Sequence, residues 1–299
     1  MNRRHFIQTT ALAATAASAL HLTATRARAE GVKSTRWPIG CYNRPWVELG
    51  WTLDTALDGI KSAGYETMGL LTPFRGEPFI GVDATPEYLA SLKEKIAARK
   101  IKAIMGAIHT KNSLSVEDSI KNVHQQIDNA KALDLEWLLT FGVDSPGDYE
   151  NYYKVMASAA PYAQERGMKL VLKPHGGGSG AAEEIMRCLT KVNRPNFKIW
   201  YDAGNIIYYT GKDPLEQLKP IIQYVTGFCA KDCAGPKGEI WLDFGKGKVD
   251  FPAVFGMMKN AGFNGPVMVE CCHKGKTPEE TTAGAQRNRE FLEKLFAQL

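Results

Sequence analysis

Hydrophobic positions along the chain gather into eight short continuous runs, and each run is followed by a stretch in which apolar residues recur at helical spacing. Unbroken apolar runs are typical of parallel strands whose outer face is covered by helices. The runs predict strands over 37–42, 65–71, 101–109, 136–143, 168–175, 197–205, 224–232 and 266–272.

The stretches between the runs carry the start signals of helices. Thr85 precedes Pro86 and Glu87, which is a capping residue followed by a proline at the first helical position. Ser115 opens another stretch in which apolar residues recur every three or four positions. Such signals predict helices over 51–63, 83–100, 115–133, 149–166, 181–192, 214–222, 252–260 and 278–299.

Eight strand–helix units in a chain of 299 residues predict an α/β fold, a single (β/α)8 TIM barrel. A doubly wound open sheet is the alternative. It usually carries a glycine-rich phosphate-binding turn after its first strand, and the sequence IGCYNRP is not such a turn. In a barrel the chemistry lies at the C-terminal ends of the strands, so the polar residues there are the candidates for function.

The N-terminus has the pattern of an export signal. Arg3-Arg4 is followed by a mildly apolar stretch, and Ala27 and Ala29 have the spacing of a signal-peptidase site. The paired arginines resemble a twin-arginine signal. The sequence therefore predicts a signal peptide over 1–29, a barrel domain over 30–299, and a periplasmic protein without a membrane anchor after processing.

The net charge of the chain narrows the classes of molecule that the protein is expected to bind. The formal net charge is +5, but residues 1–29 hold four arginines and no acidic residue, which leaves 33 basic against 32 acidic residues in the rest of the chain. A nearly neutral domain gives no reason to expect a nucleic-acid partner. No later stretch is apolar enough to predict a membrane span. The oligomeric state stays open, with a homo-oligomer among the options.

Polar residues follow the predicted strands at the end where a barrel places its active site. A buried carboxylate such as Glu270, directly after Val267-Met268-Val269, needs a cation as its partner, and the ammonium of Lys173 needs an anion. The candidates are His109, Lys173, His175, Asp202, Asn205, Lys231, Asp232 and Glu270. Asp, Glu and His side chains at one barrel mouth suit a divalent metal ion such as Mn, Co, Zn or Mg.

The motifs IWYDAGNIIYYTGKDP, FCAKDC and GKGKVDFPAVFGMMKNAGFNGPVMVEC resemble those of the sugar phosphate isomerase/epimerase family, the xylose isomerase-like barrels. The resemblance covers essentially the whole chain after the predicted signal. It implies a metal tetrad of Glu, Asp, His and Glu from strands five to eight. Asp202 and Glu270 match two of these ligands, whereas Lys173 and Cys229 stand where the family has Glu and His.

The altered tetrad allows two arrangements. In the first, His175 points to the same side of its strand as Lys173 and joins Asp202 and Glu270 as a metal ligand, while the nearby metal lowers the pKa of Lys173 and makes it a base. In the second, the Lys173 ammonium replaces the metal and pairs with both carboxylates. We favour the first and assign His175, Asp202 and Glu270 as metal ligands.

The strand-end residues and the resemblance together predict an enzyme acting on a small carbohydrate. A sugar, keto-sugar or glycoside would lose a proton next to its carbonyl with the help of the metal, which leads to epimerisation, isomerisation or a lyase step. We assign catalysis to Lys173, Lys231 and Asp232, and substrate binding to His109, Asn205 and Trp241. Lys231 and Asp232 could instead form a self-contained ion pair, and Trp241 could belong to the core. The alternative function is a non-catalytic periplasmic sugar-binding protein.

Overall fold

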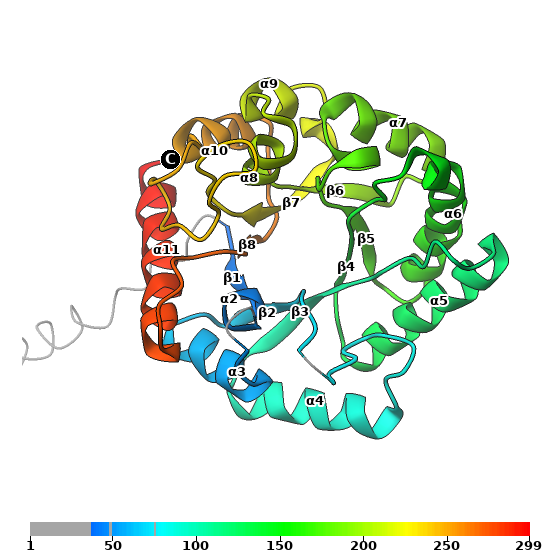
Figure 1. Cartoon of the computed structure of the whole chain (residues 1–299), viewed down its shortest axis with the longest axis horizontal. Helices are drawn as coiled ribbons and strands as arrows, with labels where there is room; N and C mark the ends of the chain where they lie inside the picture. The colour runs from blue at the N-terminus through cyan, green and yellow to red at the C-terminus, as the bar shows by residue number, and fades with distance from the viewer. Residues whose placement is uncertain (1–36, 48–49, 75) are drawn as a thin grey trace, which may run out of the picture. The chain divides into compact units, whose positions relative to one another are not determined.

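The computed structural model describes residues 37–299 except 48, 49 and 75. In this part eight parallel strands close into a barrel in chain order, with the last strand paired to the first, and helices form a ring outside them (Figure 1). The predicted single (β/α)8 TIM barrel is thus confirmed. The strands are β1 (Ile39–Tyr42), β2 (Thr67–Leu70), β3 (Lys102–Ala107), β4 (Trp137–Thr140), β5 (Lys169–Leu172), β6 (Phe197–Tyr201), β7 (Val225–Ala230) and β8 (Val267–Val269).

The longer helices lie where the apolar spacing predicts them. They are α3 (Leu53–Ser62), α4 (Pro86–Ala98), α5 (Val116–Ala132), α6 (Tyr149–Glu165), α7 (Ala182–Val192), α9 (Pro214–Leu218), α10 (Phe251–Asn260) and α11 (Pro278–Gln298). Thr85 and Ser115 cap α4 and α5 as predicted, because each side-chain oxygen accepts a hydrogen bond from a backbone N–H in the first turn. The sequence does not predict α2 (Arg44–Val47), α8 (Ala203–Asn205), or the short turns η1 (Pro146–Asp148), η2 (Gly177–Ser179), η3 (Ile206–Thr210) and η4 (Ile222–Tyr224).

Except for β1, the strands end earlier than the apolar runs predict, and the polar residues at their ends belong to loops. The run 197–205 forms β6 only as far as Tyr201, and Asp202 then caps α8 by accepting a hydrogen bond from the Asn205 backbone N–H at 2.8 Å. In the same way β5 ends one residue before Lys173, and β8 ends one residue before Glu270. The candidate side chains therefore stand on the first loop residues at the barrel mouth.

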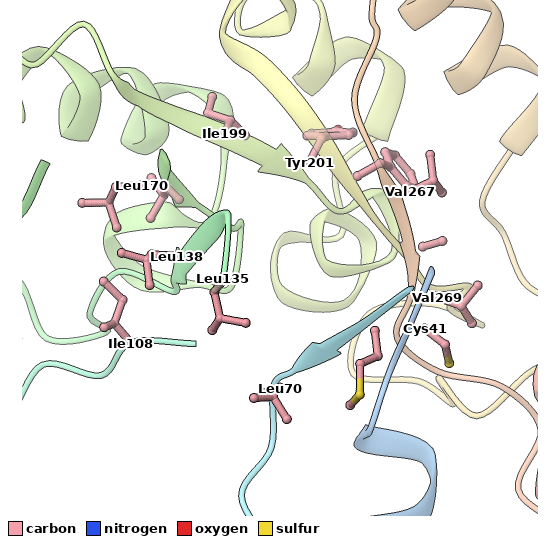
Figure 2. Close-up of a cluster of buried hydrophobic side chains, with 14 of the residues drawn as sticks. Cys41, Leu70, Ile108, Leu135, Leu138, Leu170, Ile199, Tyr201, Val267 and Val269 are labelled. Atoms are coloured by element: carbon pink, nitrogen blue, oxygen red, sulfur yellow. The ribbon is translucent and has the colours of Figure 1, made fainter. Parts of the chain in front are cut away.

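Successive strand residues alternate between two hydrophobic clusters. Leu138 and Leu170 belong to the larger cluster, which includes the buried helix residues and so lies between strands and helices (Figure 2). Their neighbours Leu139 and Val171 belong to a smaller cluster, built from the strands and the residues next to them. This smaller cluster fills the barrel interior.

The same alternation decides which residues point inward just past the strand ends. Lys173 follows the interior residue Val171 by two positions, and Asp202 and Glu270 likewise follow interior residues of β6 and β8. Asp232 instead follows, by two positions, a residue of β7 that faces outward. Its side chain is therefore directed to the opposite side. The barrel thus directs the first three side chains toward its axis and turns the fourth away.

The predicted signal peptide, 1–29, lies outside the described residues, so export stays a prediction. Among the helices of residues 37–299 that the structure describes, none has the length and apolar character needed to cross a membrane.

Candidate active site

A cavity of about 780 Å³ opens at the C-terminal ends of the strands. The loops that follow β1, β2, β3, β4, β5 and β8 all contribute to its lining. Lys173 and His175 line it from the loop after β5, and Glu270 lines it from the loop after β8. The cavity therefore lies at the end of the barrel where this fold carries its chemistry.

Five charged side chains meet beside this cavity, and we call them the charged cluster. Lys173 Nζ lies 3.2 Å from Asp202 Oδ2 and in closer contact with Glu270 Oε2. Lys231 Nζ lies 3.4 Å from Asp202 Oδ2 and 3.4 Å from Glu270 Oε1. Arg44 reaches the same Glu270 oxygen from the loop after β1. The charged cluster thus joins three cations to two carboxylates.

Burial makes the charges of this cluster interdependent. Lys173 and Glu270 are each 1 % exposed, and Asp202 is 0 % exposed. Burial alone would lower the pKa of Lys173, but the carboxylates of Glu270 and Asp202 raise it above its usual value. Burial would raise the pKa of Glu270, but Lys173, Lys231 and Arg44 bring it well below its usual range. Lys173 is therefore a permanent cation and Glu270 a permanent anion at neutral pH.

The charged cluster does not fit a divalent metal ion. A metal site needs lone pairs directed at one point, and the point between Asp202 and Glu270 is taken by the Lys173 ammonium, which has no lone pair. Among the residues that the structure describes, no three or more His, Cys, Asp or Glu side chains gather so as to hold a metal. The ligand set predicted for His175, Asp202 and Glu270 is not assembled. The contacts match the other arrangement, in which Lys173 pairs with both carboxylates.

His175 lies among aromatic rings instead of joining the carboxylates. Its Nε2 is 2.9 Å from the Tyr209 hydroxyl, and its ring centroid is 5.4 Å from that of Phe141. Burial and the positive charges of Lys173 and Lys231 lower the pKa of His175 to about 4. The imidazole is therefore neutral at pH 7 and faces the same cavity as the Lys173 ammonium.

Asn205 holds the loops together next to the charged cluster. Its Nδ2 donates to the Pro174 carbonyl at 2.6 Å, and its Oδ1 accepts a hydrogen bond from Lys231. It is buried and does not line the cavity. The substrate contact predicted for Asn205 has no support in this position. The side chain instead positions Lys231.

Asp232 also has a role other than the predicted one. Its two carboxylate oxygens accept hydrogen bonds from the backbone N–H groups of Cys233, Gly245, Gly247 and Val249, at 2.8 to 3.2 Å. A Cβ at Gly247 would collide with this carboxylate, so only glycine allows the close approach. Asp232 neither lines the cavity nor pairs with Lys231. It fixes the long loop between β7 and α10, and its assignment to catalysis does not match this geometry.

The two remaining predicted residues differ in their distance from the cavity. His109 lines it, with its ring stacked on Phe141 at a centroid separation of 5.7 Å, and burial lowers the pKa of His109. Trp241 does not line the cavity and lies under two cations, with Lys274 Nζ 3.7 Å and Arg44 Cζ 5.3 Å from its ring centroid. His109 is thus placed to contact a ligand, whereas Trp241 supports the outer side of Arg44.

Arg44 is a member of the charged cluster that the sequence analysis does not identify. Like Lys173 and Glu270, it follows a residue of the barrel interior, here Tyr42, by two positions. The same alternation of inward and outward residues therefore indicates that its side chain points inward. For Tyr209 the sequence leaves open whether the ring belongs to the core or stacks on a sugar ring. Tyr209 lies in η3, a π-helical turn whose course the apolar pattern around it does not reveal.

The comparisons with known proteins agree with this architecture. The model of the family described as xylose isomerase-like TIM barrel matches residues 57–295. A xylose isomerase-like TIM barrel protein from Mycobacterium smegmatis, in complex with magnesium, is similar with a TM-score of 0.71 and 14% identity, over 88% of this chain and 97% of that chain. A D-psicose 3-epimerase from Clostridium cellulolyticum H10, with D-tagatose, gives a TM-score of 0.69 and 13% identity, over 87% and 99%.

A xylose isomerase domain protein from Planctomyces limnophilus is also similar, with a TM-score of 0.66 and 19% identity, over 87% of this chain and 96% of that chain. At these identities the structural likeness shows the fold alone. Among curated proteins, none matches the chain.

Proposed function

The chain belongs to the xylose isomerase-like TIM barrel family, and on this premise we propose that it is an enzyme of the sugar isomerase/epimerase type. One observation carries the proposal: a permanent cation, Lys173, and a neutral imidazole, His175, line the same cavity at the strand ends. Structural neighbours named L-ribulose 3-epimerase and probable 3-DHS dehydratase support the class of reaction.

The reaction would begin with removal of a proton from the carbon next to a carbonyl group. The enediolate that remains carries negative charge on oxygen, so the site needs a base and a fixed positive charge. His175 takes the proton, and Lys173 stabilises the oxygen. Because its carboxylate partners keep Lys173 protonated, we no longer assign it the role of base. Protonation of the same carbon on its opposite face gives an epimer, protonation of the neighbouring carbon gives an isomer, and loss of a leaving group from the adjacent carbon gives elimination.

The size and lining of the cavity support a carbohydrate substrate. About 780 Å³ lies within the usual range for small-molecule sites. His109, Thr110, Asn112 and Ser145 line it and offer hydrogen-bonding groups to sugar hydroxyls. A sugar, keto-sugar or small glycoside therefore fits both the space and the chemistry.

The charged cluster also favours a second candidate, a sugar-binding protein without turnover. Its lysines are bonded to its own carboxylates, so the site can remain intact around a ligand that does not react. The two candidates differ in whether carbon-bound hydrogen exchanges with solvent.

The test is incubation of the protein with keto-sugars and 3-keto-glycosides in D₂O, with deuterium at carbon measured by mass spectrometry. We expect exchange that falls by about 10²–10⁴-fold in His175→Gln with sugar binding retained. His124→Gln is the matched control, because His124 lies on α5 against Ser158, away from the cavity. A sugar that binds tightly and is recovered without deuterium would identify the binding protein instead.

We also propose that the chain is exported through the twin-arginine pathway and cleaved after Ala29. The motif at Arg3-Arg4 and the spacing of Ala27 and Ala29 support this. In the native host, changing both arginines to lysine should leave the uncleaved precursor in the cytoplasm. Unchanged export of that variant, measured by cell fractionation, would contradict the pathway.

A further inference from the structure

We propose that the ammonium of Lys173 takes the place of a divalent cation between Asp202 and Glu270, so that this chain carries the positive charge of its site covalently and binds no metal there. The inference does not depend on which reaction the site performs. It concerns what neutralises two carboxylates that the barrel buries at the ends of β6 and β8.

The position of the ammonium is the first argument. Lys173 Nζ donates a hydrogen bond to Glu270 Oε2 and lies at an ion-pair distance of 3.2 Å from Asp202 Oδ2, which accepts no hydrogen bond from the residues that the structure describes, so the ammonium lies between both carboxylates. Its side chain is 1 % exposed, although an ammonium is costly to bury unless it is paired. A metal bound by the same two oxygens would have to displace this paired ammonium from between them.

The surrounding charge is the second argument. Lys231 lies 3.4 Å from an oxygen of each carboxylate, and Arg44 binds Glu270 as well. By formal charge the cluster already has one more positive than negative group, and burial raises the pKa of Asp202, which favours that excess further. Adding a dication would raise this excess in a buried site, which is unfavourable at a low local dielectric.

The lack of further ligands is the third argument. His175, the nearest imidazole candidate, is bonded through Nε2 to the Tyr209 hydroxyl. Cys229 Sγ is buried and lies 3.1 Å from the Tyr42 hydroxyl. His175 Nε2 and Cys229 Sγ are therefore engaged in hydrogen bonds within the protein and are not paired with the carboxylates.

The test is manganese uptake by the full-length protein, measured without any sugar. Wild type is incubated with excess MnCl₂, desalted and submitted to elemental analysis, and its melting temperature is recorded with Mn²⁺ and with EDTA. We expect substoichiometric manganese and the same melting temperature in both conditions. Stoichiometric manganese in wild type that is lost in Glu270→Gln would overturn the proposal.

A charge reversal at the same position provides the converse test. Lys173→Glu replaces the ammonium by a third carboxylate, and we expect it to take up Mn²⁺ and to melt at a higher temperature with Mn²⁺ than with EDTA. Lys169→Glu is the matched control, because Lys169 is exposed at the opposite end of β5, and it should gain neither property. A folded Lys173→Glu protein that takes up no manganese would contradict the proposal.

Should Lys173→Glu fail to fold in either condition, Lys173→Gln takes its place. This variant removes the charge and leaves an amide oxygen between the two carboxylates, so it should retain more Mn²⁺ than wild type. Equal uptake by the two proteins would contradict the proposal. Since no measurement involves a substrate, these results are independent of the deuterium-exchange test of the proposed function.

Discussion

Glu270 and Asp232 are both fully buried carboxylates that follow a barrel strand, but they are neutralised in different ways. Glu270 is bonded to the side chains of Lys173, Arg44 and Lys231, and it lines the cavity. Asp232 accepts hydrogen bonds from backbone N–H groups and points away from the cavity.

The difference lies in what each partner can do. Backbone N–H groups are fixed by the fold, so a carboxylate that binds several of them organises a loop. The side chains of Lys173 and Arg44 are cations that line the cavity, so the carboxylate that holds them sets the charge available to a ligand. Burial alone does not distinguish the two cases, whereas the type of partner does.

The largest effect is expected for Glu270→Gln. It removes one of the two carboxylates that pair with the three cations of the charged cluster, so deuterium exchange into a keto-sugar substrate should fall by about 10²–10⁴-fold. The free energy of unfolding, measured by urea denaturation, should fall by about 3–5 kcal/mol because Lys173 loses its closest partner. Glu94→Gln, at an exposed position of α4, is the control and should change neither. Full activity in Glu270→Gln would show that the cavity is not the active site.

A smaller and purely structural effect is expected for Asp232→Asn. The amide cannot accept from all the N–H groups around it, so the free energy of unfolding should fall by about 1–3 kcal/mol. Hydrogen exchange should accelerate at the backbone amides of Gly245 and Gly247, and residual activity should exceed that of Glu270→Gln. If Asp232→Asn is as inactive as Glu270→Gln while those two amides remain protected from hydrogen exchange, Asp232 does not have the purely structural role that distinguishes it from Glu270.

The smallest effect is a dependence of stability on pH that arises from His175. Its pKa is about 4 in the folded protein and 6.5 when unperturbed, so the unfolded chain takes up the proton first as the pH falls. The contribution of neutral His175 to the free energy of unfolding is fully present above pH 6.5 and is lost as the pH falls from 6.5 to about 4. After allowance for partial exposure, this amounts to about 1–2 kcal/mol. His175→Gln should lose this component of the pH profile of urea unfolding, and an unchanged profile would contradict the assignment.

The barrel and most of its elements follow from the order of apolar and polar residues along the chain. Unbroken apolar runs and capped amphipathic stretches are local patterns, and eight repeats of strand and helix leave few ways to bury them. The sequence also predicts that Lys173, Asp202 and Glu270 lie close together. Lys173 and Asp202 follow successive parallel strands, and Glu270 follows the strand that closes the barrel. The alternation of inward and outward residues, applied past the strand ends, also indicates Arg44 and separates Asp232 from the rest.

The pairing of the polar groups at the barrel mouth, in contrast, is visible only in the folded protein. His175 and Lys173 share a strand face, and no local rule states that the imidazole would bond to Tyr209 from η3 while the ammonium enters between two carboxylates. Asn205 and Asp202 likewise leave the strand pattern, because α8 begins where β6 ends. Such pairings join residues as far as 97 positions apart for Lys173 with Glu270 and 226 positions apart for Arg44 with Glu270, and they depend on how loops converge at the barrel mouth. The periodicity of apolar residues predicts structure within a single strand or helix. The charge of the site depends on contacts between residues that follow different strands.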